Sequence, residues 1–167
     1  ALLGPGGERW LALNAKVPHS RAAALYQGAE RVIASHRAAL QEGGVTVSRL
    51  VTALTAHWLS YEPVLHWQDS WLPLHHTAPQ AVAGSVAEPE ANAKGRAAAM
   101  ALRADLVTCF FEAGAVSTQL GRTYPLLPAL EPSTARILWD LKTLLDPRGL
   151  MNPGALFQGS RSAPAAT

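Results

Sequence analysis

The feature that most constrains the fold is an apolar stripe of helical spacing that ends at a glycine pair. Between Ser20 and Gly43-Gly44, apolar side chains recur on one face: Ala22, Leu25, Ala29, Val32, Ile33 and Leu40. Such spacing predicts an amphipathic helix. The hydroxyl of Ser20 is expected to cap its first turn, and the glycines to end it. The first half of the chain therefore contains one long helix.

Extended segments flank this helix. Residues 8–17 alternate in character and predict a strand that stops at Pro18. Residues 45–65 are rich in Val, Leu, Thr and aromatic side chains, but strands usually run about 3–10 residues, so this stretch is too long for one. We expect two strands, near 46–55 and 57–66, the second interrupted at Glu62-Pro63.

The remaining segments complete an α+β order. We expect a long loop at about 67–90, a helix over 91–113 ended by Gly114, a short strand over 115–120, and a helix from Ser133 that closes at Asp146-Pro147. Alternation of strands and helices in this order predicts a ferredoxin-like antiparallel sheet with helices packed on one face, plus a C-terminal helix and turn.

Composition narrows the function classes. Apolar residues make up 49% of the chain and charged residues 16%, which is typical of a globular protein. The net charge is +2 without a Lys/Arg cluster, so we expect no nucleic-acid partner. A lone cysteine, Cys109, predicts neither an internal disulfide nor a thiolate metal site.

No signal peptide or transmembrane run is visible in the sequence. We expect a cytoplasmic protein, or one that is peripheral to a membrane through a larger complex. The chain begins at Ala1 rather than Met, so it is either processed or a segment of a larger protein.

The most specific motif lies near the C-terminus. Lys142 is followed by DPRGLMNPG at residues 146–154 and then by Phe157. Two prolines and two glycines predict a rigid, sharply turning backbone. The pattern resembles the C-terminal signature of FAD-linked oxidases of the vanillyl-alcohol oxidase-like superfamily, which includes glycolate oxidase subunits and D-lactate dehydrogenases. The resemblance extends over most of residues 8–157. The alternative interpretation is a helix stop followed by ordinary turn chemistry.

The resemblance implies a domain organisation and a function. Residues 1–157 would form the C-terminal cap domain of such an enzyme, and residues 158–167 a flexible tail. The chain would be the substrate-facing part of an FAD-dependent oxidoreductase that oxidises a 2-hydroxy acid or a similar alcohol. FAD would be held mainly by an N-terminal domain or subunit absent from this chain. Asn152, Pro153 and Gly154 would contact the cofactor.

Residue candidates for the substrate follow from the same resemblance. His66 and Arg122 are the candidate catalytic residues, and Tyr61, Trp67 and Arg122 the candidate contacts to a small-molecule substrate. Arg122 could hold a carboxylate through its guanidinium fork, and His66 could accept or donate a proton. The family's Glu-His pair is absent, because Thr118, Gln119 and Leu120 stand at that place. We expect no metal site.

Two other interpretations of the function remain. One is a non-catalytic, stand-alone cap that binds a ligand or a partner, and the missing Glu-His pair favours it. The other is an unrelated ferredoxin-like binding module in which the DPRGLMNPG match is a coincidence. The truncated architecture also predicts an exposed apolar patch around residues 145–157.

Overall fold

The structure is a computed structural model that describes residues 4–77 and 86–157 of the 167-residue chain. It divides into two compact units, residues 1–116 and 117–167, and each is described by itself. The predicted tail at 158–167 and the centre of the predicted long loop lie outside the described residues. The prediction of a single domain over residues 1–157 stays a prediction.

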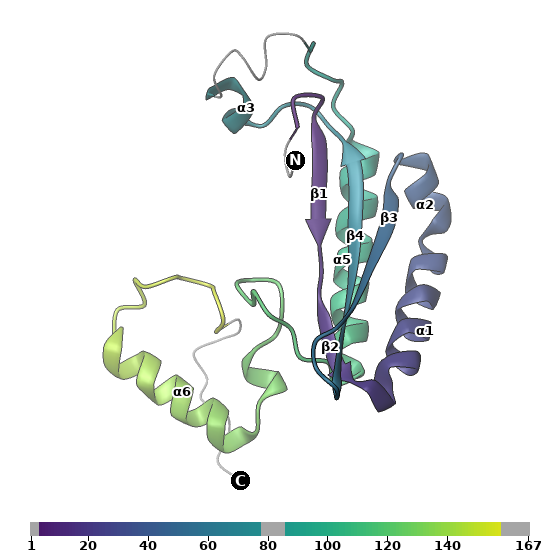
Figure 1. The fold of residues 1–167 in the computed structure, drawn as a ribbon. Coiled ribbons are helices and arrows are strands. Elements are labelled where there is room, and N and C mark those ends of the chain that lie inside the picture. The colour runs from purple at the N-terminus through teal and green to yellow at the C-terminus, as the bar shows by residue number, and fades with distance from the viewer. Residues whose placement is uncertain (1–3, 78–85, 158–167) are drawn as a thin grey trace. The chain divides into compact units, whose positions relative to one another are not determined.

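The first unit is built around one central strand. Its elements are β1 (Glu8–Ala12), β2 (Ala15–Pro18), α1 (His19–Ser35), α2 (Arg37–Glu42), β3 (Thr46–Ala53), β4 (Trp58–Gln68), α3 (Pro73–Thr77) and α5 (Ala93–Glu112). Strand β4 pairs antiparallel with β1 and β2 along one side and with β3 along the other (Figure 1). The two expected strands near 46–55 and 57–66 are therefore present as β3 and β4.

A proline explains why the first predicted strand appears as two. Ala12 opposes Val64 and Ala15 opposes Tyr61, so β1 and β2 follow one continuous register against β4. The break falls opposite Glu62 and Pro63. The amide of Leu13 donates to the Pro63 carbonyl at 3.0 Å, but Pro63 has no N–H to return the bond. The ladder therefore loses one rung at this point.

The helices α1 and α5 cover the same face of the sheet. The ring of Tyr61 on β4 makes edge contacts with Tyr26 of α1 and with Phe110 of α5. The core beneath them contains Leu13, Val17, Leu25, Leu65, Leu102 and Leu106. This is the predicted α+β, ferredoxin-like arrangement. The expected strand at 115–120 is reduced to one bridge, between Lys16 and Val116.

The expected Ser20 cap and the expected unbroken helix after it are both wrong. Helix α1 begins at His19 after Pro18 rather than at a Ser20 cap, and the amide of His19 donates to the His57 carbonyl at 2.9 Å. The predicted long helix also breaks at His36, whose Nε2 lies 2.7 Å from Asp105 on α5. Backbone contacts and proline geometry decided these boundaries, so the nearby serine was a misleading signal.

A buried carboxylate, Asp69, lies where β4 ends. Asp69 accepts the backbone amides of Ser70 and Asn92, at 2.9 and 2.8 Å, and pairs with Arg96 at 2.9 Å. Burial pushes the pKa of Asp69 up, but these amide bonds and the charges of Arg96 and Arg9 hold it below its usual range. Asp69 is therefore ionised and fixes the start of α5 to the end of β4.

The second unit contains the short helix η1 (Leu127–Ala129) and α6 (Pro132–Leu145). Helix α6 starts with Pro132 after Glu131, and no side chain caps it, so the predicted Ser133 cap is wrong. Proline suits this position because its missing N–H would be unpaired there in any case. Asp146 ends the helix as expected.

The start of α5 passes very close to the end of α2, and this approach requires glycine. A Cβ at Gly95 would lie 2.6 Å from Asn92 Nδ2 and 2.7 Å from the Gly43 carbonyl. Asn92 caps α5 by accepting the Gly95 amide, and its own amide group donates to Gly43. The cap and the close approach share the same few atoms.

We expect Gly95→Ala to lower the free energy of unfolding by about 1 kcal/mol or more, because overpacking costs ~1–3 kcal/mol and the helix-propensity gain is only ~1 kcal/mol. Gly28→Ala in α1 is the control, since the added Cβ would lie at an ordinary contact distance of 3.4 Å from Sγ of Cys109 in α5. Urea unfolding followed by circular dichroism should show loss for Gly95→Ala and equal or higher stability for Gly28→Ala. Equal stabilities of the two variants would contradict the close-approach argument.

Candidate functional site

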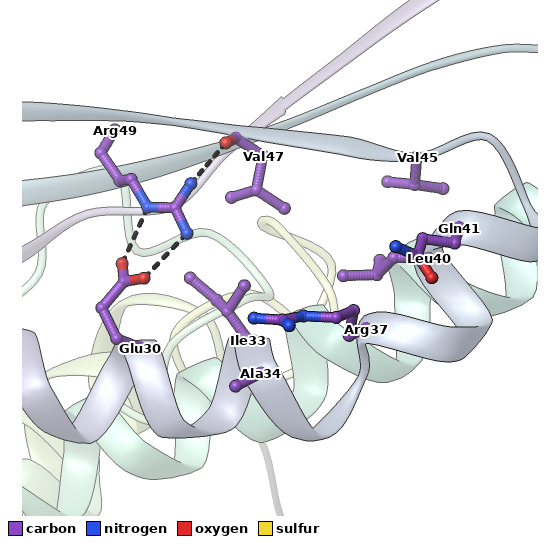
Figure 2. Close-up of a pocket in the computed structure, with 9 residues that line it drawn as sticks. All are labelled: Glu30, Ile33, Ala34, Arg37, Leu40, Gln41, Val45, Val47 and Arg49. Atoms are coloured by element: carbon purple, nitrogen blue, oxygen red, sulfur yellow. Dashed lines mark hydrogen bonds and ion pairs between the residues drawn. The ribbon is translucent and has the colours of Figure 1, made fainter.

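A groove runs between β3 and the helices α1 and α2 (Figure 2). It encloses a cavity of about 230 Å³. Its lining residues are Glu30, Ile33, Ala34, Arg37, Leu40, Gln41, Val45, Val47 and Arg49. Ile33, Leu40 and Val45 are buried and form an apolar floor, whereas Arg37 and Gln41 are exposed. The groove therefore combines an apolar base with a polar rim.

One end of the groove is closed by three hydrogen-bonded residues, Glu30, Arg49 and Tyr61, which we call the trio. Arg49 donates from Nε and from one terminal nitrogen to the two oxygens of Glu30, each at 2.8 Å, as the dashed lines of Figure 2 show. The hydroxyl of Tyr61 donates to Glu30 Oε1 at 2.9 Å. A forked pair of this kind fixes orientation as well as charge. Glu30 and Arg49 thus join α1 to β3.

Each residue of the trio keeps one protonation state at neutral pH. The Arg49 hydrogen bonds lower the pKa of Glu30 against the opposing effect of burial, and Tyr61 assists. The Glu30 bond raises the pKa of Arg49. Burial, followed by the hydrogen bond to Glu30, raises the pKa of Tyr61 well above its usual range. At neutral pH Glu30 is ionised and Tyr61 is protonated, so the trio serves to hold structure rather than to exchange protons.

Strand β3 presents an open edge beside this groove. Within the described residues β3 pairs only with β4. The amide of Leu54 bonds to the Trp58 carbonyl, so the backbone groups of even-numbered residues turn toward β4. Those of Val47, Arg49 and Val51 then turn outward. Arg49 donates to the outward Val47 carbonyl at 2.6 Å, which agrees with this alternation.

The sequence-predicted residues of the first unit do not form one site. His66 lies on β4 with Nε2 2.8 Å from the Ser48 hydroxyl. His66 and Trp67 line a hollow of about 490 Å³ at the start of β1 and the end of β4. Tyr61 is only 1% exposed and lies beneath the helices. The substrate and catalytic roles of these residues stay predictions.

The second unit contains Arg122 and the Asn152–Gly154 turn, and the structure brings them together. Arg122 donates to the Pro153 carbonyl at 2.6 Å. Asp146 accepts the amides of Leu150 and Met151, both at 2.8 Å, and bonds Lys142. Asn152 adopts a left-handed backbone conformation. Asp146, Asn152 and Pro153 of the DPRGLMNPG motif therefore have local, structural roles. Cofactor binding by Asn152, Pro153 and Gly154 and catalysis by Arg122 stay predictions.

Several apolar side chains of helix α6 are exposed to solvent. Its inner side contains Ala135, Leu138 and Trp139, and Trp139 contacts Phe157. The exposed apolar side chains on and after the helix are Ile137, Leu141, Leu144, Leu145, Leu150 and Met151. Leu144 is 77% exposed. The predicted apolar patch around residues 145–157 is confirmed, and it extends back along α6.

The described residues contain no group of three or more His, Cys, Asp or Glu side chains placed to hold a metal ion. None of the helices in this part of the chain has the length and apolar character needed to cross a bilayer.

Fold and groove together define an α+β unit with an open sheet edge. The chain is similar to a curated pyruvate kinase from Agrobacterium vitis, with 31% identity over 137 residues. The matched region is 75% of this chain but only 26% of that protein, so the chain spans about a quarter of its relative. No family model matches the chain, and no solved structure does.

These comparisons contradict the predicted membership in the FAD-linked oxidases. The curated relative is described as a pyruvate kinase, and nothing in the comparisons points to a flavin or to an oxidoreductase. The physical reason lies in the motif: Lys142, Asp146 and the glycines build a self-contained turn, and the same turn chemistry can arise without a flavin domain. FAD binding by this chain stays a prediction.

Sequence reasoning missed the trio and the groove. Glu30 and Arg49 are 19 residues apart, and neither belongs to a recognisable motif. The available signal was the single charge, Arg49, in a strand that otherwise contains Thr, Val, Ser, Leu and Ala. A lone charge of this kind indicates a partner in space but does not identify it.

Removing the Tyr61 hydroxyl tests the trio. Tyr61→Phe should lower the free energy of unfolding by about 1–2 kcal/mol, because Glu30 loses one donor in a partly buried place. Tyr26→Phe is the matched control, since Tyr26 is exposed and its hydroxyl has no hydrogen-bond partner among the described residues. Urea unfolding monitored by circular dichroism checks both, and equal losses would contradict the assigned hydrogen bond.

The turn after α6 predicts an acid-sensitive second unit. Lys142 and two backbone amides lower the pKa of Asp146 to about 2, against the opposing effect of burial. Because the folded pKa lies below the unfolded value of about 3.9, the stabilisation is complete above roughly pH 4 and is lost as pH falls toward 2. Carboxyl carbon shifts in an NMR titration should give a midpoint near 2 for Asp146.

Two variants complete this test. Asp146→Asn should abolish the acid dependence of the Leu150 and Met151 amide shifts, whereas Asp140→Asn, on exposed α6 surface, should leave it unchanged. An Asp146 midpoint near 3.9 would show that the turn does not depend on this carboxylate.

Proposed function

We propose that this chain is a non-catalytic binding module that takes up an extended segment of a polypeptide as an added strand on β3. The observation that supports this most strongly is the open edge of β3 beside the groove of Figure 2. Backbone groups on such an edge supply hydrogen bonds to any extended chain, and a neighbouring pocket supplies side-chain selection.

The groove has the features that strand addition needs. The outward backbone groups of Arg49 and Val51 would pair with the added strand. Alternate side chains of that strand would meet the apolar floor of Ile33, Leu40 and Val45. Arg37 and Gln41 are exposed on the rim of the groove.

The chemistry of the groove favours binding over catalysis. Its charged pair is closed on itself, and Tyr61 is held protonated by burial and by Glu30. Catalytic groups instead need a pKa near the working pH and a free face toward the substrate. Because the chain spans 26% of the pyruvate kinase relative, the activity in that protein's name is not extended to it.

A proline at Val51 gives a sharp test. Because the Val51 amide turns outward, Val51→Pro removes a donor from the open edge without removing a β3–β4 bond. Val51→Thr keeps the amide and the branched side chain. A random peptide library displayed on phage would supply binders, and their affinities would be compared by fluorescence polarisation.

We expect the selected peptides to bind the wild type and Val51→Thr within about threefold, and to lose at least about tenfold on Val51→Pro. Thr52→Pro should instead unfold the β3–β4 ladder, since the Thr52 amide turns toward β4. Failure to select any peptide, or binding that a folded Val51→Pro variant retains, would overturn the proposal.

A further inference from the structure

The end of the β3–β4 hairpin exposes apolar surface on both faces of the sheet. Leu50 is 54% exposed and Val51 is 52% exposed, although neighbouring residues on a strand point to opposite faces. Leu54 and Trp58 continue the patch at the hairpin end. The edge lacks the lysines, prolines and bulges that commonly keep edge strands from pairing. These features favour the pairing of β3 with a further strand.

The sequence of β3 is partly symmetric about Leu50. Centred on Leu50, Ser48 corresponds to Thr52 and Val47 to Ala53. Arg49 corresponds to Val51 and Thr46 to Leu54, and these two pairs differ in kind. When such a strand lies antiparallel against a copy of itself, Leu50 meets Leu50, Ser48 meets Thr52 and Val47 meets Ala53, whereas Arg49 meets Val51.

We propose that the polypeptide taken up by β3 is the β3 strand of a second copy of this chain, antiparallel and in register at Leu50. This inference rests on the proposed function, because it names the occupant of the same edge. The two sheets would join into one continuous sheet through a two-fold axis at Leu50.

Backbone direction selects this register. Pairing needs residues with outward backbone groups to face one another, and Arg49 then opposes Val51 of the other copy. Leu50 opposes Leu50, and Ser48 opposes Thr52. A register centred on Arg49 would instead place two guanidinium groups directly opposite, which is destabilising.

The Glu30–Arg49 ion pair allows Arg49 to be buried between the two paired β3 strands. Arg49 is the only charged residue of β3, and both of its partners, Glu30 and the Val47 carbonyl, come from its own chain. Its charge is therefore already compensated when a second strand covers the edge, which reduces the cost of removing it from water.

Cysteine crosslinking tests the register directly. The backbone groups of Leu50 turn toward β4, so the Leu50 pair across the axis would be of the non-hydrogen-bonded type, with Cα atoms about 4.5 Å apart. Disulfides form at Cα separations of about 4.4–6.8 Å. All variants would be made in a Cys109→Ser background, so that the introduced cysteine is the only thiol.

We expect Leu50→Cys to form a covalent dimer on mild oxidation, and neither Ser48→Cys nor Thr52→Cys to do so alone. The double variant with both Ser48→Cys and Thr52→Cys should crosslink, because each cysteine then faces the other. Sedimentation equilibrium of the unmodified chain should show a dimer that Val51→Pro shifts to monomer and Val51→Thr preserves.

The outcomes separate this inference from the proposed function. A monomer without Leu50→Cys crosslinking, which still binds selected peptides in a Val51→Pro-sensitive way, overturns the self-pairing and leaves strand addition standing. A monomer that binds no peptide overturns both. Efficient crosslinking of Ser48→Cys instead of Leu50→Cys, or a dimer that a folded Val51→Pro variant retains, overturns the self-pairing through this register.

Discussion

The first unit depends on β4, because every other strand described in its sheet pairs with β4. One side of β4 receives β1 and β2 in a shared register, and the other receives β3. Tyr61 at its middle is covered by α1 and α5. Within the described part of the chain, β3 is paired along one side only. The open edge is thus a consequence of the topology, and it does not require a special sequence.

The ionised groups of the first unit mainly hold elements in place. Asp69 fixes the start of α5 to the end of β4, and Glu30 fixes α1 to Arg49 on β3. Both carboxylates have lowered pKa values because their donors favour the charged form. Since these charges are already paired, the proposed binding at β3 would depend on backbone groups and apolar side chains.

Much of the first unit could be predicted from sequence. Apolar periodicity located α5 and the β3–β4 pair, and their order indicated the α+β fold. Prolines were read less well: Pro63 lies inside β4, because only one partner rung is lost there. The C-terminal motif misled for a different reason. Lys142 and Asp146 are explained by turn-local bonds, and a turn carries little information about cofactor or reaction.

The candidate site could not be found in the same way, because its main component is the backbone of an edge strand. Period-two patterning shows which faces of a strand are buried, but it is silent on which strand lies at the edge. On β3 even this pattern is weak, since Leu50 and Val51 are both exposed. That weakness is itself informative once the topology is known. A strand that is exposed on both faces, and that pairs along one side only within the described residues, can bury more of its apolar side chains by gaining a neighbouring strand.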